Sequence, residues 1–146
     1  MVLISNSVII RCTPEQAFDY LSDLRNELDW NPTCERMEKV TDGPVRSGTR
    51  FRAKWKLSPV VDLQILEYDR PHCWTAHNGG PLEVTMTVRL EPVPAGTRLS
   101  TDFDARPHGF LKLIFPILLR RLRAEEKANM GHIRAALERR HATNAP

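Results

Sequence analysis

The 146-residue sequence has few cysteines, and their arrangement argues against a disulfide-stabilised protein. Cys12, Cys34 and Cys73 make an odd number, and no two of them are spaced as CxxC. Disulfide frameworks and zinc sites usually need paired cysteines at short spacing. A chain of this length buries roughly 68–70% of its unfolded surface, so it needs no such cross-links. We therefore expect a protein of a reducing compartment and assign it to the cytoplasm.

Long hydrophobic runs are also missing. The longest apolar stretch, residues 110–122, contains Lys112, Pro116 and two arginines. It is shorter than the ~20 residues that a helix needs to span a bilayer. The N-terminal segment lacks a basic region and is interrupted by polar residues at positions 5–7, so we interpret it as a strand rather than a signal peptide.

The sequence contains none of the common motifs for nucleotide, nucleophile or metal chemistry. It has no GxGxxG, no Walker loop, no GxSxG and no HExxH. His72 and His77 would face opposite sides of a strand. Cys73 and His77 would share a face but lie ~13 Å apart, which is too far for one metal ion. We expect no metal and no other cofactor.

The charge pattern gives little support to a nucleic-acid partner. Lys and Arg number 21 against 18 Asp and Glu, a net charge of +3. A basic stripe on segment 50–56 has no aromatic residues on its own face, as an RNA platform would need. A second basic group lies near the C-terminus, mixed with acidic residues. We interpret it as a solvated helix face, with peripheral contact to an anionic membrane as the alternative, because apolar neighbours accompany it. These basic residues are Arg120, Arg121, Arg123, Lys127 and Arg134, mixed with Glu125 and Glu138 and beside Leu113, Ile114 and Ile117.

A capping box marks the start of a first helix, after an N-terminal strand at residues 2–11. The run Thr13-Pro14-Glu15-Gln16 combines a capping threonine, a proline suited to the first helical position and a glutamine three residues after the cap. A second short helical segment begins near Asp23 and ends at Trp30-Asn31-Pro32, because the residue before a proline avoids helical backbone angles.

Between residues 33 and 105 apolar and polar residues alternate, which is the pattern of strands with one buried face. Segment 50–57 is the clearest case, and the same alternation occurs at 61–65, 82–90 and 99–105. Turn signals rich in proline and glycine separate these segments. We therefore expect an antiparallel sheet of about seven strands with one face packed and the other wet.

The chain from Pro107 to about Arg140 has the periodicity of one long helix. Pro116 must either kink this helix or divide it into two pieces. Asn129 lies on the apolar stripe and Glu126 lies close beside it. The stripe comprises Leu111, Phe115, Leu118, Leu122, Ile133 and Leu137.

One helix is too narrow to cover the apolar face of such a sheet. A helix is ~10 Å across, whereas six or seven strands spaced by ~4.8 Å are about three times wider. The sheet can close this gap only by curling around the helix, and a curled sheet on a single helix tends to leave an internal space. A core filled by bulky side chains is the alternative.

Several short motifs occur in an order typical of one superfamily. They are Pro14-Glu15-Gln16-Ala17-Phe18, Asp23, Trp30-Asn31-Pro32, Ser47-Gly48-Thr49-Arg50, Asp69-Arg70-Pro71 and Ala95-Gly96-Thr97-Arg98-Leu99. Along residues 2–140 the sequence resembles the START-like (SRPBCC) superfamily, and within it the polyketide cyclase/dehydrase and lipid transport group. The resemblance implies one α+β helix-grip domain over residues 1–146, with a hydrophobic cavity between the sheet and the C-terminal helix. It implies no reaction, since members bind lipids, sterols, polyketides or hormones and only some are enzymes.

The inward-facing side chains are the candidate ligand site. Glu126 and Asn129 interrupt the apolar helix face, so they either orient a ligand's polar group or find partners in the protein, Asn129 on the sheet and Glu126 at its edge. Glu126 is also a candidate acid/base. The strand face of His77 is not decided, because Trp74 points the other way and also favours burial. The candidate ligand-binding residues are Trp30, Phe51, Trp55, Leu63, His77, Met86, Phe103, Phe115, Leu118, Leu122, Glu126 and Asn129.

The sequence thus favours binding, with transport as an extension, of a small hydrophobic molecule such as a lipid or polyketide. The alternative is a cyclase or dehydratase that acts on a polyketide-like substrate in the same cavity. The oligomeric state is open, with a homodimer as one option.

Overall fold

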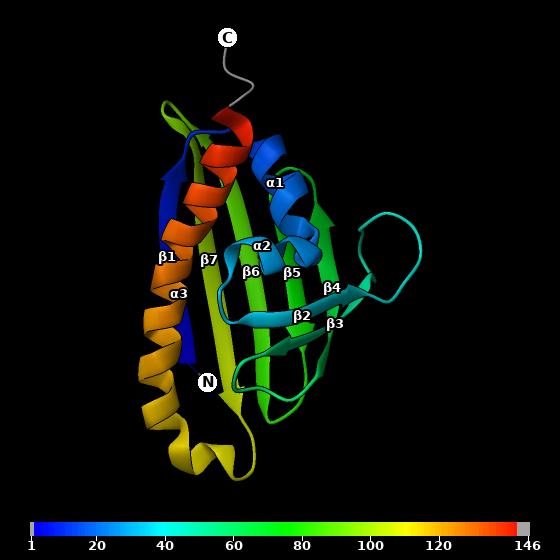
Figure 1. Cartoon of the computed structure of the whole chain (residues 1–146), viewed down its shortest axis with the longest axis vertical. Coiled ribbons are helices and arrows are strands. Elements are labelled where there is room, and N and C mark those ends of the chain that lie inside the picture. Colours follow the sequence, from blue (N-terminus) through cyan, green and yellow to red (C-terminus); the bar gives the residue numbers. More distant parts are fainter. Residues whose placement is uncertain (1, 143–146) are drawn as a thin grey trace.

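The computed structural model describes residues 2–142. They form a curled antiparallel sheet that wraps around one long helix (Figure 1). The strand order is β1-β7-β6-β5-β4-β3-β2. This architecture confirms the expected α+β helix-grip fold. The helical segments are α1 (Pro14–Ser22), η1 (Leu24–Asn26), α2 (Glu27–Trp30) and α3 (Leu111–Ala142), and the strands are β1 (Val2–Ile10), β2 (Cys34–Lys39), β3 (Arg50–Trp55), β4 (Val61–Asp69), β5 (Cys73–Asn78), β6 (Leu82–Val93) and β7 (Gly96–Pro107).

The sheet curls strongly, as expected from the mismatch between its width and one helix. In Figure 1, β2 and β3 run across the direction of β5, β6 and β7, so the two ends of the sheet face different ways. Register shifts interrupt the ladders between Cys34 and Arg36 and between Ile65 and Glu67. Such bulges increase local twist and bend a strand. They lie on the half of the sheet that turns away.

The capping box at the start of α1 is present. The Gln16 backbone N–H donates to Thr13 Oγ1 at 3.1 Å, and the Thr13 N–H donates to Gln16 Oε1 at 3.0 Å. The first helix therefore begins where the sequence predicted, directly after β1. Two short helical segments, η1 and α2, follow it and end at Trp30, before Asn31-Pro32.

Gly96 lets the β6–β7 hairpin pass close to the chain that leaves β1. Its φ is 141°, and a Cβ at this position would lie 2.2 Å from the Ile10 carbonyl oxygen. Only glycine allows this approach without a shift of the backbone. The hairpin is thereby held against the end of β1 that leads into α1.

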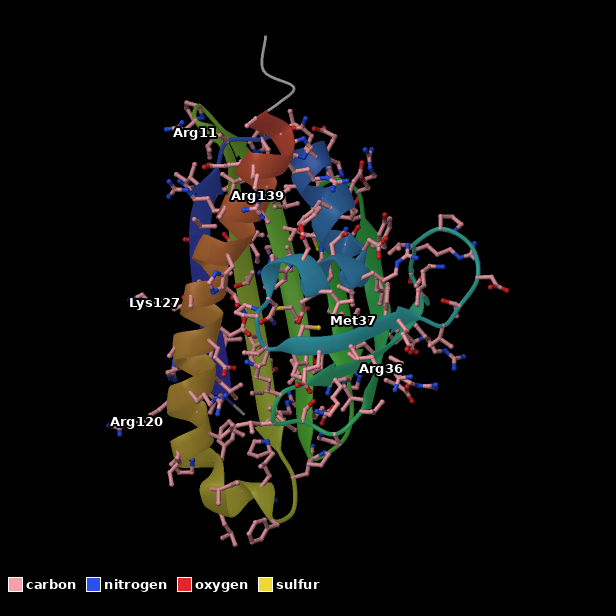
Figure 2. The ribbon with its side chains drawn as sticks, viewed as in Figure 1. Arg11, Arg36, Met37, Arg120, Lys127 and Arg139 are labelled. Atoms are coloured by element: carbon pink, nitrogen blue, oxygen red, sulfur yellow. The ribbon has the colours of Figure 1, made fainter. Side chains whose placement is uncertain are left out.

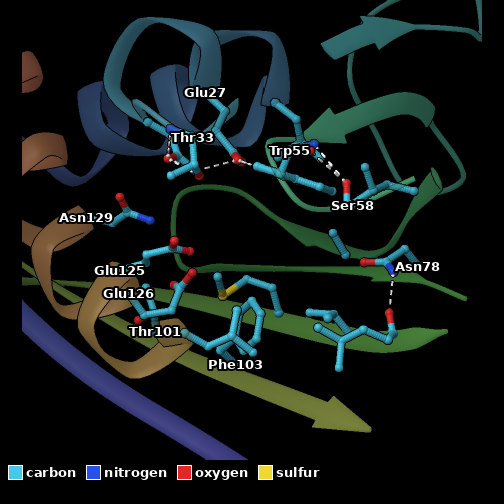
Figure 3. A pocket seen from close by; sticks show the side chains of 18 of the residues that line it. Glu27, Thr33, Trp55, Ser58, Asn78, Thr101, Phe103, Glu125, Glu126 and Asn129 are labelled. Carbon is cyan, nitrogen blue, oxygen red and sulfur yellow. Dashed lines mark hydrogen bonds between the residues drawn. The ribbon is translucent and has the colours of Figure 1, made fainter. Parts of the chain in front are cut away.

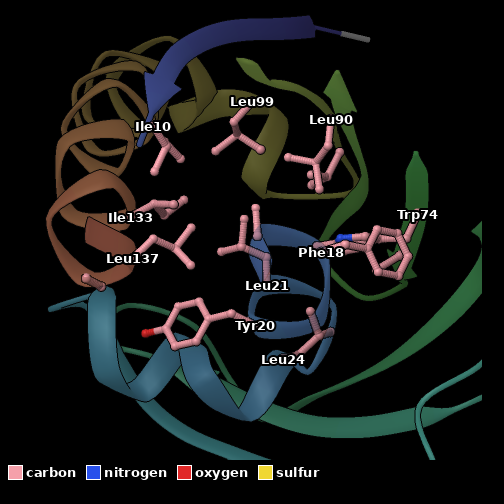
Figure 4. Packing of buried hydrophobic residues seen from close by; sticks show 14 of the residues in the cluster. Ile10, Phe18, Tyr20, Leu21, Leu24, Trp74, Leu90, Leu99, Ile133 and Leu137 are labelled. Atoms are coloured by element: carbon pink, nitrogen blue, oxygen red, sulfur yellow. The ribbon is translucent and has the colours of Figure 1, made fainter. Parts of the chain in front are cut away.

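The long helix α3 contains Pro116 and continues through it to Ala142. The beginning of α3 lies at an angle to the rest in Figure 1, and a proline in a helix interior is the usual cause of such a kink. The last turns pack in the hydrophobic core, where Ile133 and Leu137 point toward Ile10 and Leu21 (Figure 4). The core contacts of α3 thus lie near α1, whereas the middle of the helix faces the sheet.

Candidate ligand-binding cavity

A cavity of about 300 Å³ lies between the middle of α3, the segment around α2 and the concave face of the sheet. Its size is at the lower end of the range for small-molecule sites. The strands contribute mainly apolar walls, while most of the polar side chains come from α2, α3 and the loops. The apolar lining includes Leu21, Leu24, Trp30, Trp55, Val61, Leu63, Trp74, Ala76, Val84, Met86, Val88, Leu99, Phe103, Leu118, Leu122, Met130 and Ile133.

Most of the candidate residues from the sequence lie together around this cavity. Trp30 comes from α2, Trp55 from the end of β3, and the other apolar members from β4, β6, β7 and α3. The alternation of the strands explains this, because each contributes every second side chain to the concave face. That these residues bind a ligand stays a prediction. The candidates that line the cavity are Trp30, Trp55, Leu63, Met86, Phe103, Leu118, Leu122, Glu126 and Asn129.

Three candidates do not line the cavity. Phe51 is completely buried in the packed core, and Phe115 is 93% buried away from the lining. His77 lies on the convex face of β5. Trp74, Ala76 and Asn78 of the same strand line the cavity, and the alternation of the strand directs His77 to the opposite side. The His77 ring instead contacts Glu83 Oε2 through Nε2 at 2.8 Å. The structure thus places these three side chains outside the cavity lining.

Glu27 is a polar group of the cavity whose carboxyl group is held by two hydrogen-bond donors. Its Oε2 accepts hydrogen bonds from Trp55 Nε1 at 2.5 Å and from Asn31 Nδ2 at 2.9 Å (Figure 3). Burial raises the pKa of Glu27, and the two hydrogen bonds oppose this shift. The carboxyl group is therefore fixed in place by donors but has no cationic partner among residues 2–142.

Glu126 projects from α3 into the same region. Burial raises the pKa of Glu126 to about 8, and the nearby carboxylates of Glu27 and Glu125 add to the shift. No hydrogen bond or ion pair to the Glu126 side chain is present in the described part of the chain. The neighbouring Glu125 differs, because Arg121 Nε donates to its Oε1 at 2.7 Å. Glu126 is thus a carboxyl group that can gain or lose a proton near neutral pH.

Asn129 lies one turn further along α3 and is 95% buried. Its side chain forms no hydrogen bond with the sheet or with any other described residue, so the partner expected on the sheet is absent from the structure. Asn129 and Thr101 both line the cavity, and of the two only the Thr101 Oγ1 atom is fully buried without a hydrogen-bond partner in the described residues. Buried polar groups without partners are costly in a folded protein.

Replacing Asn129 with leucine should therefore stabilise the protein, not weaken it. The substitution Asn129→Leu removes an amide that faces the cavity and makes no hydrogen bond to a described residue, so no protein hydrogen bond is lost and apolar contact is gained. We expect a higher melting temperature in differential scanning calorimetry. A fall in melting temperature would show that the amide makes a stabilising hydrogen bond. Asn26→Leu is the matched control, because the Asn26 side chain donates to the Tyr20 carbonyl at 2.7 Å and its loss should destabilise.

The comparison with protein families decides where the chain belongs. A profile of the family described as polyketide cyclase / dehydrase and lipid transport matches residues 1–138. The chain belongs to this family. No curated protein matches the sequence. The family assignment agrees with the resemblance found in the motifs, and it leaves the ligand and any reaction of this member unassigned.

Solved structures share the fold at low sequence identity. Protein TTHA0849 from Thermus thermophilus matches with a TM-score of 0.77 and 16% identity, over 93% of this chain and 97% of its own. The Zhui aromatase/cyclase from a Streptomyces species matches with a TM-score of 0.75 and 15% identity, over 95% and 94%. The Aha1 dimer from Colwellia psychrerythraea gives 0.69 and 15%, over 94% and 97%. At these identities the similarity shows that the proteins share a fold, and it shows nothing about their ligands or activities.

Cys12, Cys34 and Cys73 are free thiols. No helix within residues 2–142 has both the length and the apolar character needed to cross a membrane. In that same range, no group of three or more His, Cys, Asp or Glu side chains is placed to hold a metal ion.

Three polar residues that line the cavity were not predicted from the sequence. Arg121 and Glu125 were expected on the outer, solvated face of the long helix, but both border the cavity. Glu27 was not a candidate, because one acidic residue in a short helical turn carries no sequence signal of its own. Only the curl of the sheet, which brings Trp55 to Glu27, reveals its position.

Proposed function

We propose that this protein binds a small hydrophobic molecule, such as a lipid or a polyketide, in the cavity beneath α3. The observation that carries the proposal is a space of about 300 Å³ whose walls are mainly apolar side chains. Apolar surface that leaves water contributes roughly 25 cal/mol per Å² to binding. Membership of a family described by polyketide chemistry and lipid transport supports the same ligand class.

Native mass spectrometry of the purified protein tests this proposal. We expect a noncovalent adduct of a few hundred daltons, in the range of a small-molecule ligand. Extraction with organic solvent should remove it and release an apolar compound. A protein that carries no adduct, and acquires none after incubation with a lipid extract, would contradict the proposal.

A cyclase or dehydratase activity is the second candidate, and Glu126 is the observation that favours it. A carboxyl group with a pKa of about 8 is suited to general acid–base chemistry near neutral pH. As a base it would remove a proton from a carbon that lies between two carbonyls. This carbon would then attack a different carbonyl further along the same substrate chain. As an acid it would protonate the hydroxyl that leaves as water. Loss of turnover of a poly-β-keto thioester in Glu126→Gln, with binding retained, would support this activity.

The start of α3 carries a surface suited to an anionic lipid membrane, and we propose peripheral contact there. Phe110, Leu113 and Ile117 are each at least three-quarters exposed. Basic side chains accompany them, and Figure 2 shows Arg120 pointing away from the sheet. Apolar residues flanked by basic ones are typical of proteins that lie on membrane surfaces.

The double substitution Phe110→Ser with Leu113→Ser should weaken binding to phosphatidylserine vesicles. Each apolar side chain buried in the membrane contributes about 1.5–3 kcal/mol, so a loss of at least tenfold is expected. Vesicle co-sedimentation measures it. Leu66→Ser is the matched control, because Leu66 is also exposed but lies on β4. Equal sedimentation of the double variant and the wild type would contradict membrane contact at this surface.

A further inference from the structure

The polar groups of the cavity gather at one place, between α2 and the middle of α3. Figure 3 shows the side chains of Glu27, Glu126 and Asn129 directed toward the same space. Glu27 is held by Trp55 and Asn31, while Glu126 and the buried Asn129 have no hydrogen-bond partner in the described residues. An apolar cavity with unpaired polar groups at one end is suited to a ligand with an apolar body and one polar head.

Most ionisable groups at this end of the cavity are acidic, although the whole chain carries a net charge of +3. The one ion pair at its edge joins Arg121 to Glu125 and leaves Glu27 and Glu126 without a cation. Strands β5, β6 and β7 contribute no charged side chain to the lining. Glu27 and Glu126 thus have no ion-pair partner among the residues described, so a cation from outside the protein can pair with them.

We propose that the ligand of this cavity is a cationic amphiphile, whose protonated amine lies between Glu27 and Glu126 while its apolar body fills the space toward Phe103 and Leu122. The proposal rests on the proposed binding function and specifies the chemistry of the ligand's head group. The Asn129 amide oxygen offers the same ammonium a third acceptor.

Competing head groups fit this end of the cavity less well. A carboxylate would place its negative charge beside two acidic groups that have no cationic partner, which is unfavourable in a space of low dielectric constant. A hydroxyl would form hydrogen bonds but would not stabilise the ionised form of either carboxyl group, as a cation does. An ammonium provides three donors, and its hydrogen bonds to carboxylates are roughly twice as strong as neutral ones.

Binding of an amine should release a proton from Glu126. Its raised pKa keeps the carboxyl group largely protonated at neutral pH, and a cation beside it favours the ionised form. The other charged or titratable groups around this end are Glu125 and Arg121 on α3, Glu27 on α2, Lys56 after β3 and Cys34 on β2. The Cys34 thiol does not contribute near neutral pH, because burial raises its pKa to about 12.

Three probes of equal chain length test the proposal: decylamine, decanol and decanoate. Isothermal titration calorimetry at neutral pH, repeated in buffers of different ionisation enthalpy, gives both the affinity and the protons exchanged. We expect decylamine to bind at least about tenfold more tightly than decanol, the factor that corresponds to one pKa unit moved on Glu126. Decanoate should bind weakest, and decylamine should release close to one proton.

Charge-removing variants locate the effect. Glu126→Gln should abolish the proton release and reduce the preference for decylamine over decanol to less than about threefold. Glu27→Gln provides a second variant if the first does not fold. Glu91→Gln is the matched control, because it removes the same charge from a surface pair with Arg98. It should leave the preference unchanged.

The outcomes separate this inference from the proposed function. Equal binding of all three probes, or tightest binding of decanoate, would overturn the cationic head group but leave hydrophobic binding intact. Failure of all three probes to bind would overturn both. A preference for decylamine that persists in both Glu126→Gln and Glu27→Gln would place the amine elsewhere and overturn the assignment to this site.

Discussion

Raising the pH from about 5 to 9 should destabilise the wild-type protein much more than its Glu126→Gln variant. Glu126 has a folded-state pKa of about 8, against 4.5 for an ordinary glutamate. Between these two values the native state binds more protons at this group than the unfolded state does. The free energy of unfolding therefore falls as the pH rises through this window, and no further loss occurs well above pH 8. At 1.36 kcal/mol per pKa unit the total loss from this group is up to about 5 kcal/mol.

Urea denaturation of both proteins across this pH range measures the effect. The difference between wild type and variant cancels every group that titrates in the same way in both proteins. Cys12 stays protonated throughout, because burial raises its pKa to about 11. Glu27 is coupled to Glu126, so the double variant Glu27→Gln with Glu126→Gln shows how the effect is shared. Parallel pH profiles for wild type and Glu126→Gln would show that Glu126 is an ordinary solvated carboxylate.

Truncating two leucines on the same stripe of α3 should have very different costs. Leu137 is completely buried in the core formed with α1 and β1, so Leu137→Ala should lose roughly 2–5 kcal/mol of stability (Figure 4). Leu122 lines the cavity and is only half-buried. Its truncation enlarges an existing space and leaves no new void in dense packing. Leu122→Ala should therefore cost less than about 2 kcal/mol, at or below the bottom of the same range.

Chemical denaturation compares the two variants directly, and each serves as the control for the other. Binding should show the opposite order, because Leu122→Ala removes part of the ligand's contact surface and Leu137→Ala does not. A cost for Leu122→Ala as large as that for Leu137→Ala would mean that the space around Leu122 is filled in the native protein.

Local signals in the sequence were sufficient for most of the fold. The Thr13–Gln16 capping box places the start of α1, and the alternation in segments 50–57 and 82–90 separates the wet face from the packed face. The width of the sheet relative to one helix indicated a curled sheet with a space inside. These inferences succeed because they rest on spacing and on simple geometry, which do not depend on distant contacts.

Details of the site depended on contacts that spacing does not encode. In β5, both faces are largely buried, so alternation did not show that Trp74 takes the concave face and His77 the convex one. Phe51 faces inward as expected, but the curl of the sheet sets it in the packed core and not at the cavity. Arg121 and Glu125 lie at the edge of the helix stripe, where the kinked start of α3 decides which side chains border the cavity.

The central claim, an apolar cavity that binds a small molecule, is tested most directly by titration with the neutral fluorophore N-phenylnaphthylamine. We expect a saturable rise in fluorescence with one site per chain. The variant Leu122→Trp, which places a larger side chain in the cavity, should weaken this binding while keeping its melting temperature, and Leu66→Trp on the outer face of β4 should leave it unchanged. No saturable binding by the wild type, or equal binding by wild type and Leu122→Trp, would contradict the account.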